Sequence, residues 1–139
     1  MKKKLKPKIT VFHCINAINN CESLPVPYKS SFKLKSVKMA CSGMVKDSFL
    51  LRAFEAGSDA VIVFVCPEGQ CRYVEGNIRA KNRVNWVKKL LDEIEIGGKR
   101  LSIHNIANGD TEAAVHIIRQ VLVDINELGP NPARHWNNY

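Results

Sequence analysis

The run Ala60–Val65, with the sequence AVIVFV, constrains the fold of this chain more than any other feature. All of its residues are apolar and most are Val or Ile, the pattern of a β-strand that is covered on both faces. Such strands are typical of parallel sheets, because the helices that connect parallel strands pack against both faces of the sheet. We therefore predict a central strand here, extending from Ala60 to Cys66.

Three further apolar segments predict the other strands of the sheet. They are Lys8–Cys14, Leu34–Cys41 and Leu101–Ala107. The last two alternate apolar with polar residues, as strands at the edge of a sheet do. Between Cys14 and Leu34 the chain contains two prolines and several asparagines, so we expect a loop there with at most a short helix.

Helical patterns separate the remaining strands. We expect one helix to be capped by Asp47 and to end at Gly57, a longer one to run from about Val74 to Glu95, and a last one to run from Asp110 to Gly129. The two longer helices carry apolar stripes at three- and four-residue spacing, formed by Val84, Val87, Leu91 and Ile94 and by Val115, Ile118, Leu122 and Ile125.

The alternation of strands and helices predicts an α/β fold. Two edge-like strands flank two buried ones, which gives a small flavodoxin-like open parallel sheet of four strands in the order 2-1-3-4, with helices on both faces. Neither of the common glycine-rich phosphate-binding motifs follows the first strand. The sequence therefore lacks the usual support for nucleotide or flavin binding.

The 139 residues are most simply one domain, which we place at 8–130. Residues 1–7 form a basic tail, and residues 131–139, with His135, Trp136 and Tyr139, form an extension that we expect to dock on a partner. Much of the net charge of +8 comes from the first eight residues, which contain Lys2, Lys3, Lys4, Lys6 and Lys8, and no nucleic-acid-binding motif is present. With neither a membrane-spanning run nor a secretory signal, we predict a cytoplasmic protein without membrane insertion.

The five cysteines suggest the chemistry. Cys14, Cys41 and Cys66 each end a predicted strand, and Cys71 follows five residues after Cys66. The carboxyl ends of parallel strands lie on one edge of the sheet, where open α/β folds build their sites. Adjacent strands are about 4.8 Å apart, so these four thiols are predicted to reach one centre.

Several functions compete for such thiols. A single cysteine is most often a buried core residue, and the reducing cytoplasm disfavours disulfides. Thiol catalysis needs a neighbouring base, but His13 and Cys14 point to opposite faces of their strand, and we interpret His104 and His116 as ordinary histidines. Zinc and iron–sulfur clusters both accept four thiolates, and the absence of paired C-x2-C motifs favours an iron–sulfur cluster over zinc.

Three segments carry a resemblance to a known family. They are MACSGMV at 39–45, the following FLLRAFEAGSDAVIV, and CPEGQCRYVEGNIRAKNRV at 66–84. In these motifs the chain resembles the delta subunit family of the methyl-viologen-reducing hydrogenase, over about residues 8–130. The resemblance implies a small cytoplasmic [2Fe–2S] protein. It would pass electrons between a donating enzyme and the flavin-bearing A component of a heterodisulfide-reductase-like, electron-bifurcating complex.

The resemblance also implies the cluster ligands. Phe12 and Cys14 match the family motif of the first strand, and Cys41, Cys66 and Cys71 match as well. The family's second cysteine of that strand is replaced by Ala17, and Cys21 is an alternative fourth ligand if its loop folds back. The chain also has Met44 and Pro67 where the family often has a basic residue and a histidine. The backbone N–H groups near Gly43 and Gly69 could approach the sulfurs.

We therefore predict a non-catalytic electron-transfer subunit with one [2Fe–2S] cluster held by Cys14, Cys41, Cys66 and Cys71. Its expected partners are a heterodisulfide reductase A-like flavoprotein and an electron-donating hydrogenase or dehydrogenase subunit. Near the cluster loop, the cations Arg72, Arg79, Lys81 and Arg83 form either a solvated helix face or a surface for an acidic partner. The alternative function is a zinc-stabilised protein-interaction module without redox chemistry.

Overall fold

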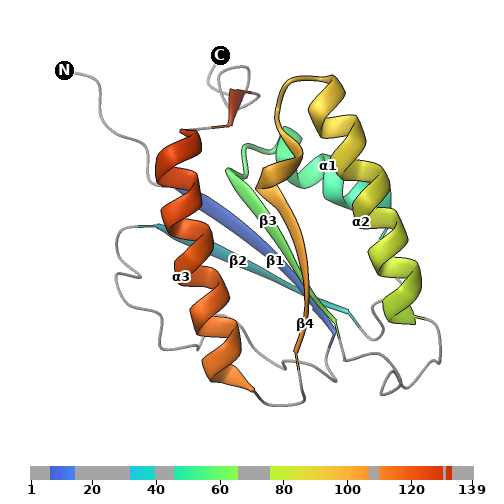
Figure 1. Cartoon of the computed structure of the whole chain (residues 1–139), viewed down its shortest axis with the longest axis vertical. Helices are drawn as coiled ribbons and strands as arrows, with labels where there is room; N and C mark the ends of the chain where they lie inside the picture. The colour runs from blue at the N-terminus through green and yellow to red at the C-terminus, as the bar shows by residue number, and fades with distance from the viewer. Residues whose placement is uncertain are drawn as a thin grey trace.

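The computed structural model describes residues 7–14, 32–39, 46–65, 76–106, 110–129 and 131–132. Strands and helices alternate over most of its length (Figure 1). In chain order the elements are β1 (Lys8–Cys14), β2 (Lys33–Met39), α1 (Asp47–Glu55), β3 (Ala60–Val65), α2 (Gly76–Glu93), the short 3-10 helix η3 (Gly98–Arg100), β4 (Leu101–Asn105) and α3 (Thr111–Leu128).

The four strands form one parallel sheet in the order β2-β1-β3-β4, which confirms the predicted topology. In the register, Phe12 of β1 lies opposite Val37 of β2 and Val63 of β3, and Val63 lies opposite Ile103 of β4. Every residue of β3 is buried, whereas β2 and β4 are partly exposed. The continuous apolar run therefore identifies a central strand, as expected.

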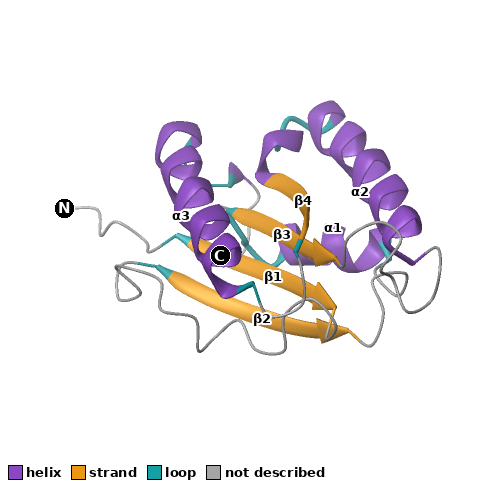
Figure 2. Ribbon diagram, turned by 60° about the horizontal axis from the view of Figure 1, so that its bottom comes forward, coloured by secondary structure: helices purple, strands orange, loops and turns teal. Residues whose placement is uncertain are grey.

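Helices cover both faces of the sheet, α3 on one and α1 with α2 on the other (Figures 1 and 2). Alternate residues of a strand point to opposite faces, so each strand contributes to two cores. In β3, Ile62 and Phe64 pack in the α3 core, whereas Val61, Val63 and Val65 pack in the α1–α2 core.

The ends of the helices test the predicted caps. Asp110 caps α3, because its carboxylate accepts a hydrogen bond of 3.1 Å from the Ala113 N–H. The cap predicted at Asp47 is wrong. Lys46 occupies the N-cap of α1 without a side-chain hydrogen bond, and Asp47 lies within the first turn, where a carboxylate favours the positive end of the helix.

The apolar stripe of α2 is shorter than predicted. Val84, Val87 and Leu91 are completely buried, but Ile94 is 57% exposed and follows the last helical residue, Glu93. The chain turns away here through Glu95 and Gly97, both with positive φ. The periodic pattern therefore continues beyond the end of the helix that it identifies.

Strand ends also differ slightly from the prediction. β2, β3 and β4 end at Met39, Val65 and Asn105. The cysteines that we expected to end the second and third strands follow these ends, outside the described residues. None of the helices in the described ranges is both long enough and apolar enough to cross a membrane.

Candidate metal centre

The predicted metal centre lies where the strands end. Cys14, the last residue of β1, is paired with Met39, the last residue of β2, and one residue earlier His13 is paired with Phe64 of β3. The carboxyl ends of three adjacent parallel strands therefore meet at one edge of the sheet. We call it the carboxyl edge.

Of the predicted ligands, the structure describes only the backbone of Cys14. Cys41 comes two residues after Met39, Cys66 comes directly after Val65, and Cys71 belongs to the same connection. These three cysteines lie outside the described residues, as do Cys21, Ala17, Gly43 and Gly69. In the ranges that the structure describes, no group of three or more His, Cys, Asp or Glu side chains could hold a metal ion.

The buried side chains at the carboxyl edge are apolar. Phe12, Met39 and Val65 are at most 7% exposed and belong to the core beneath α1 and α2. On the α3 face, Phe64 is completely buried. A cofactor bound at this edge would therefore contact apolar side chains that exclude water, which lowers the local dielectric constant and strengthens electrostatic interactions.

His13, next to the predicted ligand Cys14, is completely buried on the α3 face. Its Nε2 atom lies 2.6 Å from the Ser36 hydroxyl of β2, so the two side chains form a hydrogen bond. This bond orients the ring away from the α1–α2 face. His13 is thus part of the packed interior.

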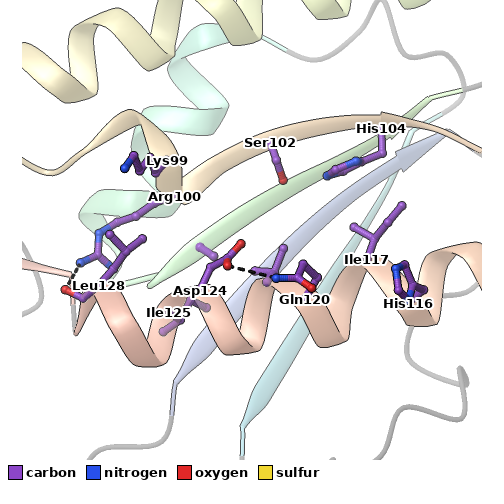
Figure 3. Close-up of a pocket in the computed structure, with 12 residues that line it drawn as sticks. Lys99, Arg100, Ser102, His104, His116, Ile117, Gln120, Asp124, Ile125 and Leu128 are labelled. Carbon is purple, nitrogen blue, oxygen red and sulfur yellow. Dashed lines mark hydrogen bonds between the residues drawn. The ribbon is translucent and has the colours of Figure 1, made fainter.

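His104 borders a cleft of about 180 Å³ between β4 and α3 (Figure 3). Its ring lies 6.3 Å from that of Phe64, and its buried Nε2 atom has no hydrogen-bond partner among the described residues. Burial and, to a smaller extent, the charge of Lys88 lower the pKa of His104, which favours the neutral ring. His116 lines the same cleft from α3. None of the described residues that line the cleft is a cysteine.

Sequence patterns missed a polar cluster at the opposite edge, where the strands begin. The buried carboxylate of Asp59 accepts hydrogen bonds of 2.8 Å from the backbone N–H groups of Lys8 and Asn131. The side-chain amide of Asn131 donates to the carbonyl oxygens of Phe54 and Ser58, at 3.0 and 2.7 Å. A buried asparagine between two prolines is the one local signal of this role.

Arg100 completes this polar cluster. Its guanidinium donates to the carbonyl oxygens of Ile96, Asp59 and Leu128, at 3.0, 3.1 and 3.4 Å. Burial lowers the pKa of Arg100, and the charge of Asp59 partly opposes that shift. We call Asp59, Arg100 and Asn131 the amino-edge clamp. It ties the end of α3 to the starts of three strands, far from the carboxyl edge (Figure 1).

The predicted basic face is partly described. Arg79 and Lys81 are exposed on α2, and Arg83 is partly buried. The start of α2 lies beside the carboxyl ends of the strands, at the lower right of Figure 1. These cations are therefore on the helix that leaves the candidate centre, whereas Arg72 lies outside the described residues.

Comparison with known proteins identifies the family. The model of the family "Methyl-viologen-reducing hydrogenase, delta subunit" (FlpD) matches residues 9–129. The vhu iron-sulfur D component of the F420-non-reducing hydrogenase of Methanocaldococcus jannaschii is 35% identical over 101 residues, which cover 73% of this chain and 75% of that protein. The iron-sulfur D component of the F420-non-reducing hydrogenase of Archaeoglobus profundus is 31% identical over 134 residues, 94% of this chain and 96% of that protein.

A much longer protein also contains a similar segment. The A component of the ferredoxin/F(420)H(2)-dependent CoB-CoM heterodisulfide reductase of Methanosarcina acetivorans is 29% identical over 128 residues, which cover 89% of this chain but only 16% of that protein. Relatives of this chain thus occur both as separate iron–sulfur proteins and within larger polypeptides. With the family model spanning nearly the whole sheet and its helices, the chain belongs to the methyl-viologen-reducing hydrogenase delta subunit family.

Proposed function

We propose that this chain is an electron-transfer subunit that holds one [2Fe–2S] cluster through Cys14, Cys41, Cys66 and Cys71. The observation that carries the proposal is the parallel β2-β1-β3 arrangement, because three of these cysteines end or closely follow its three strands. The words "iron-sulfur subunit" in the names of two relatives support the choice of an iron–sulfur cluster over zinc.

The donor set fits the cofactor. Four thiolates are the usual protein ligands of a [2Fe–2S] cluster, which would supply one-electron transfer when bound. Cys66 directly follows Val65 in the sequence, and Val65 is paired with Asn105 in the sheet. At the carboxyl edge the buried residues are apolar, and α2, which carries Arg79 and Lys81, begins beside this edge. Nearby cations favour the reduced, more negative state of an iron–sulfur cluster.

The partners in this proposal are a hydrogenase or another dehydrogenase as electron donor and a heterodisulfide reductase A-like flavoprotein as acceptor, in the cytoplasm. Two observations support them. Two relatives are named as hydrogenase subunits, and the A component of a heterodisulfide reductase contains a segment that is similar to this chain. Covalent linkage keeps two domains at high effective concentration, which suits domains that exchange electrons.

Analysis of the anaerobically purified protein tests the cofactor. We expect about two irons and two acid-labile sulfides per chain, with visible absorption that is bleached by dithionite. Stoichiometric zinc in a colourless protein would contradict the proposal and support the zinc-stabilised interaction module instead.

Serine variants test the ligands. We expect Cys14→Ser, Cys41→Ser, Cys66→Ser and Cys71→Ser each to lose or strongly perturb the cluster, because each removes a thiolate. Cys21→Ser is the matched control and should keep the wild-type spectrum. If Cys21→Ser loses the cluster while Cys14→Ser retains it, Cys21 takes the place of the family cysteine missing at Ala17.

A further inference from the structure

The described part of the chain has two exposed aromatic side chains, and both belong to the layer formed by α1 and α2. Phe49 of α1 is 42% exposed and Trp86 of α2 is 56% exposed. The exposed large hydrophobic residues of α3 are aliphatic, namely Val123 and Leu128. The two helix layers therefore present different surfaces to solvent.

Trp86 lies on the outer side of α2. The inward side is formed by Ala80, Val84, Val87 and Leu91, all completely buried. Helix geometry places Arg83, Lys89 and Leu90 next to Trp86, at spacings of three and four residues. Ile94, 57% exposed, continues this stripe beyond the helix. No element drawn as a described helix or strand covers this side of α2 (Figures 1 and 2).

The charge of α2 is unusual. Over Gly76–Glu93 it contains five cations, Arg79, Lys81, Arg83, Lys88 and Lys89, against two carboxylates, Asp92 and Glu93, at its end. By contrast, α3 contains three carboxylates, Glu112, Asp124 and Glu127, against the single cation Arg119. The basic charge of the described helices is thus concentrated on one side of the sheet.

Helix stability does not explain this distribution. Cations near the start of a helix oppose its macrodipole, and the first turn of α2 has no acidic residue to offset them. An exposed tryptophan on a helix with this charge is typical of a binding surface.

We propose that the outer face of α2, centred on Trp86 and flanked by Arg83 and Lys89, is the docking surface for an acidic protein partner. Trp and Arg are the residue types most enriched at binding hot spots, and complementary charges accelerate association. α2 starts beside the carboxyl edge, and Trp86 follows about 15 Å further along the helix, so a partner that binds here and extends towards the start of α2 reaches the candidate cluster. The choice of partner in the following test rests on the proposed function.

The surface fits a protein better than a nucleic acid. Leu90 and Ile94 extend the apolar stripe away from the cations, which suits a pocket in a protein surface. Near Ile94 the carboxylates of Asp92, Glu93 and Glu95 interrupt the basic surface and would repel a uniformly charged phosphate backbone, whereas a folded partner can place its acidic side chains opposite the cations alone.

The test measures binding of the holoprotein to the purified heterodisulfide reductase A-like flavoprotein encoded in the same genome. We expect Trp86→Ala to raise the dissociation constant by about 30-fold, the effect of removing a hot spot. Arg83→Glu and Lys89→Glu should weaken binding and reduce its dependence on ionic strength. The matched controls on α3, Val123→Ala and Arg119→Glu, should bind as the wild type does.

The inference is overturned if Trp86→Ala and Val123→Ala bind equally well, or if the wild type does not bind the flavoprotein. It is also overturned if single-stranded DNA or RNA binds more tightly than the flavoprotein and Trp86→Ala abolishes that binding. Iron and labile-sulfide analysis of each variant separates this inference from the proposed function. If Trp86→Ala has a normal cluster and binds the flavoprotein as the wild type does, the docking surface alone is refuted. If the wild type has no cluster but still binds the flavoprotein through Trp86, only the proposed cofactor is refuted.

Discussion

Replacing Asp59 by alanine should strongly destabilise the fold. The carboxylate is 1% exposed and accepts two backbone hydrogen bonds of 2.8 Å, from Lys8 and Asn131. A hydrogen bond to a charged group contributes about 1.5–3 kcal/mol, and the Lys8 N–H is partly solvated and can bind water in the variant. We therefore expect Asp59→Ala to lower the free energy of unfolding by about 3–5 kcal/mol.

Asp110→Ala is the matched control for this variant. Asp110 also accepts a hydrogen bond from a backbone N–H, that of Ala113, but at an exposed helix cap. Its loss should cost about 1 kcal/mol. Anaerobic urea denaturation followed by circular dichroism measures both variants against the wild type. If Asp59→Ala is no more destabilising than Asp110→Ala, the amino-edge clamp does not stabilise the fold in the way proposed.

Four further variants probe the same structure by urea denaturation. Asn131→Ala should cost about 2 kcal/mol, because it removes the amide that donates to the carbonyl oxygens of Phe54 and Ser58, of which that of Phe54 keeps the Gly57 N–H; a loss below that of Asp110→Ala would contradict this. Leu91→Ala should cost about 2–5 kcal/mol because it leaves a cavity in the core, whereas Ile94→Ala should cost less than about 0.5 kcal/mol. Similar losses for the two variants would contradict the finding that the buried stripe of α2 ends before Ile94. The pKa of His104 is lowered below 6.5 in the folded state, so the unfolded chain takes up a proton first and stability falls as the pH drops below about 6.5. His104→Phe should reduce this loss, and an unchanged difference between neutral and acidic pH would refute the assignment.

The fold was predictable because its strongest signals are local. The run Ala60–Val65 identifies a strand buried on both faces, and edge-like alternation identifies the second and fourth strands, which together determine the strand order. Gly57 and Asp110 mark helix ends through their own backbone and side-chain chemistry. Such signals need only a few neighbouring residues.

The amino-edge clamp could not be predicted because its partners are distant in the sequence. Asp59 and Asn131 are 72 residues apart, and Arg100 and Asp59 are 41 apart. No local pattern distinguishes a buried Asp or Arg of this kind from one on the surface. The prediction that Ile94 belongs to the apolar stripe of the helix was wrong for a related reason, because periodicity does not reveal where tertiary contacts end a helix.

The candidate centre was only partly predictable. Parallel topology indicates that residues ending adjacent strands share an edge, and the register of Cys14 with Met39 agrees with this. Which thiolates bind the metal depends on the connections after the strands, which lie outside the described residues. The ligand set therefore stays a prediction, which the serine variants test.

The two edges of the sheet have separate roles, which makes those variants interpretable. A seven-residue strand such as β1 is about 20 Å long, so the amino-edge clamp and the carboxyl edge are too far apart to share contacts. Mutations at such a separation usually have additive effects on stability. A cysteine variant that loses iron should therefore keep the hydrogen bonds of Asp59 and Asn131 and the core around β3. Loss of the cluster with retained helical content then identifies a ligand, because general unfolding would disrupt both edges together.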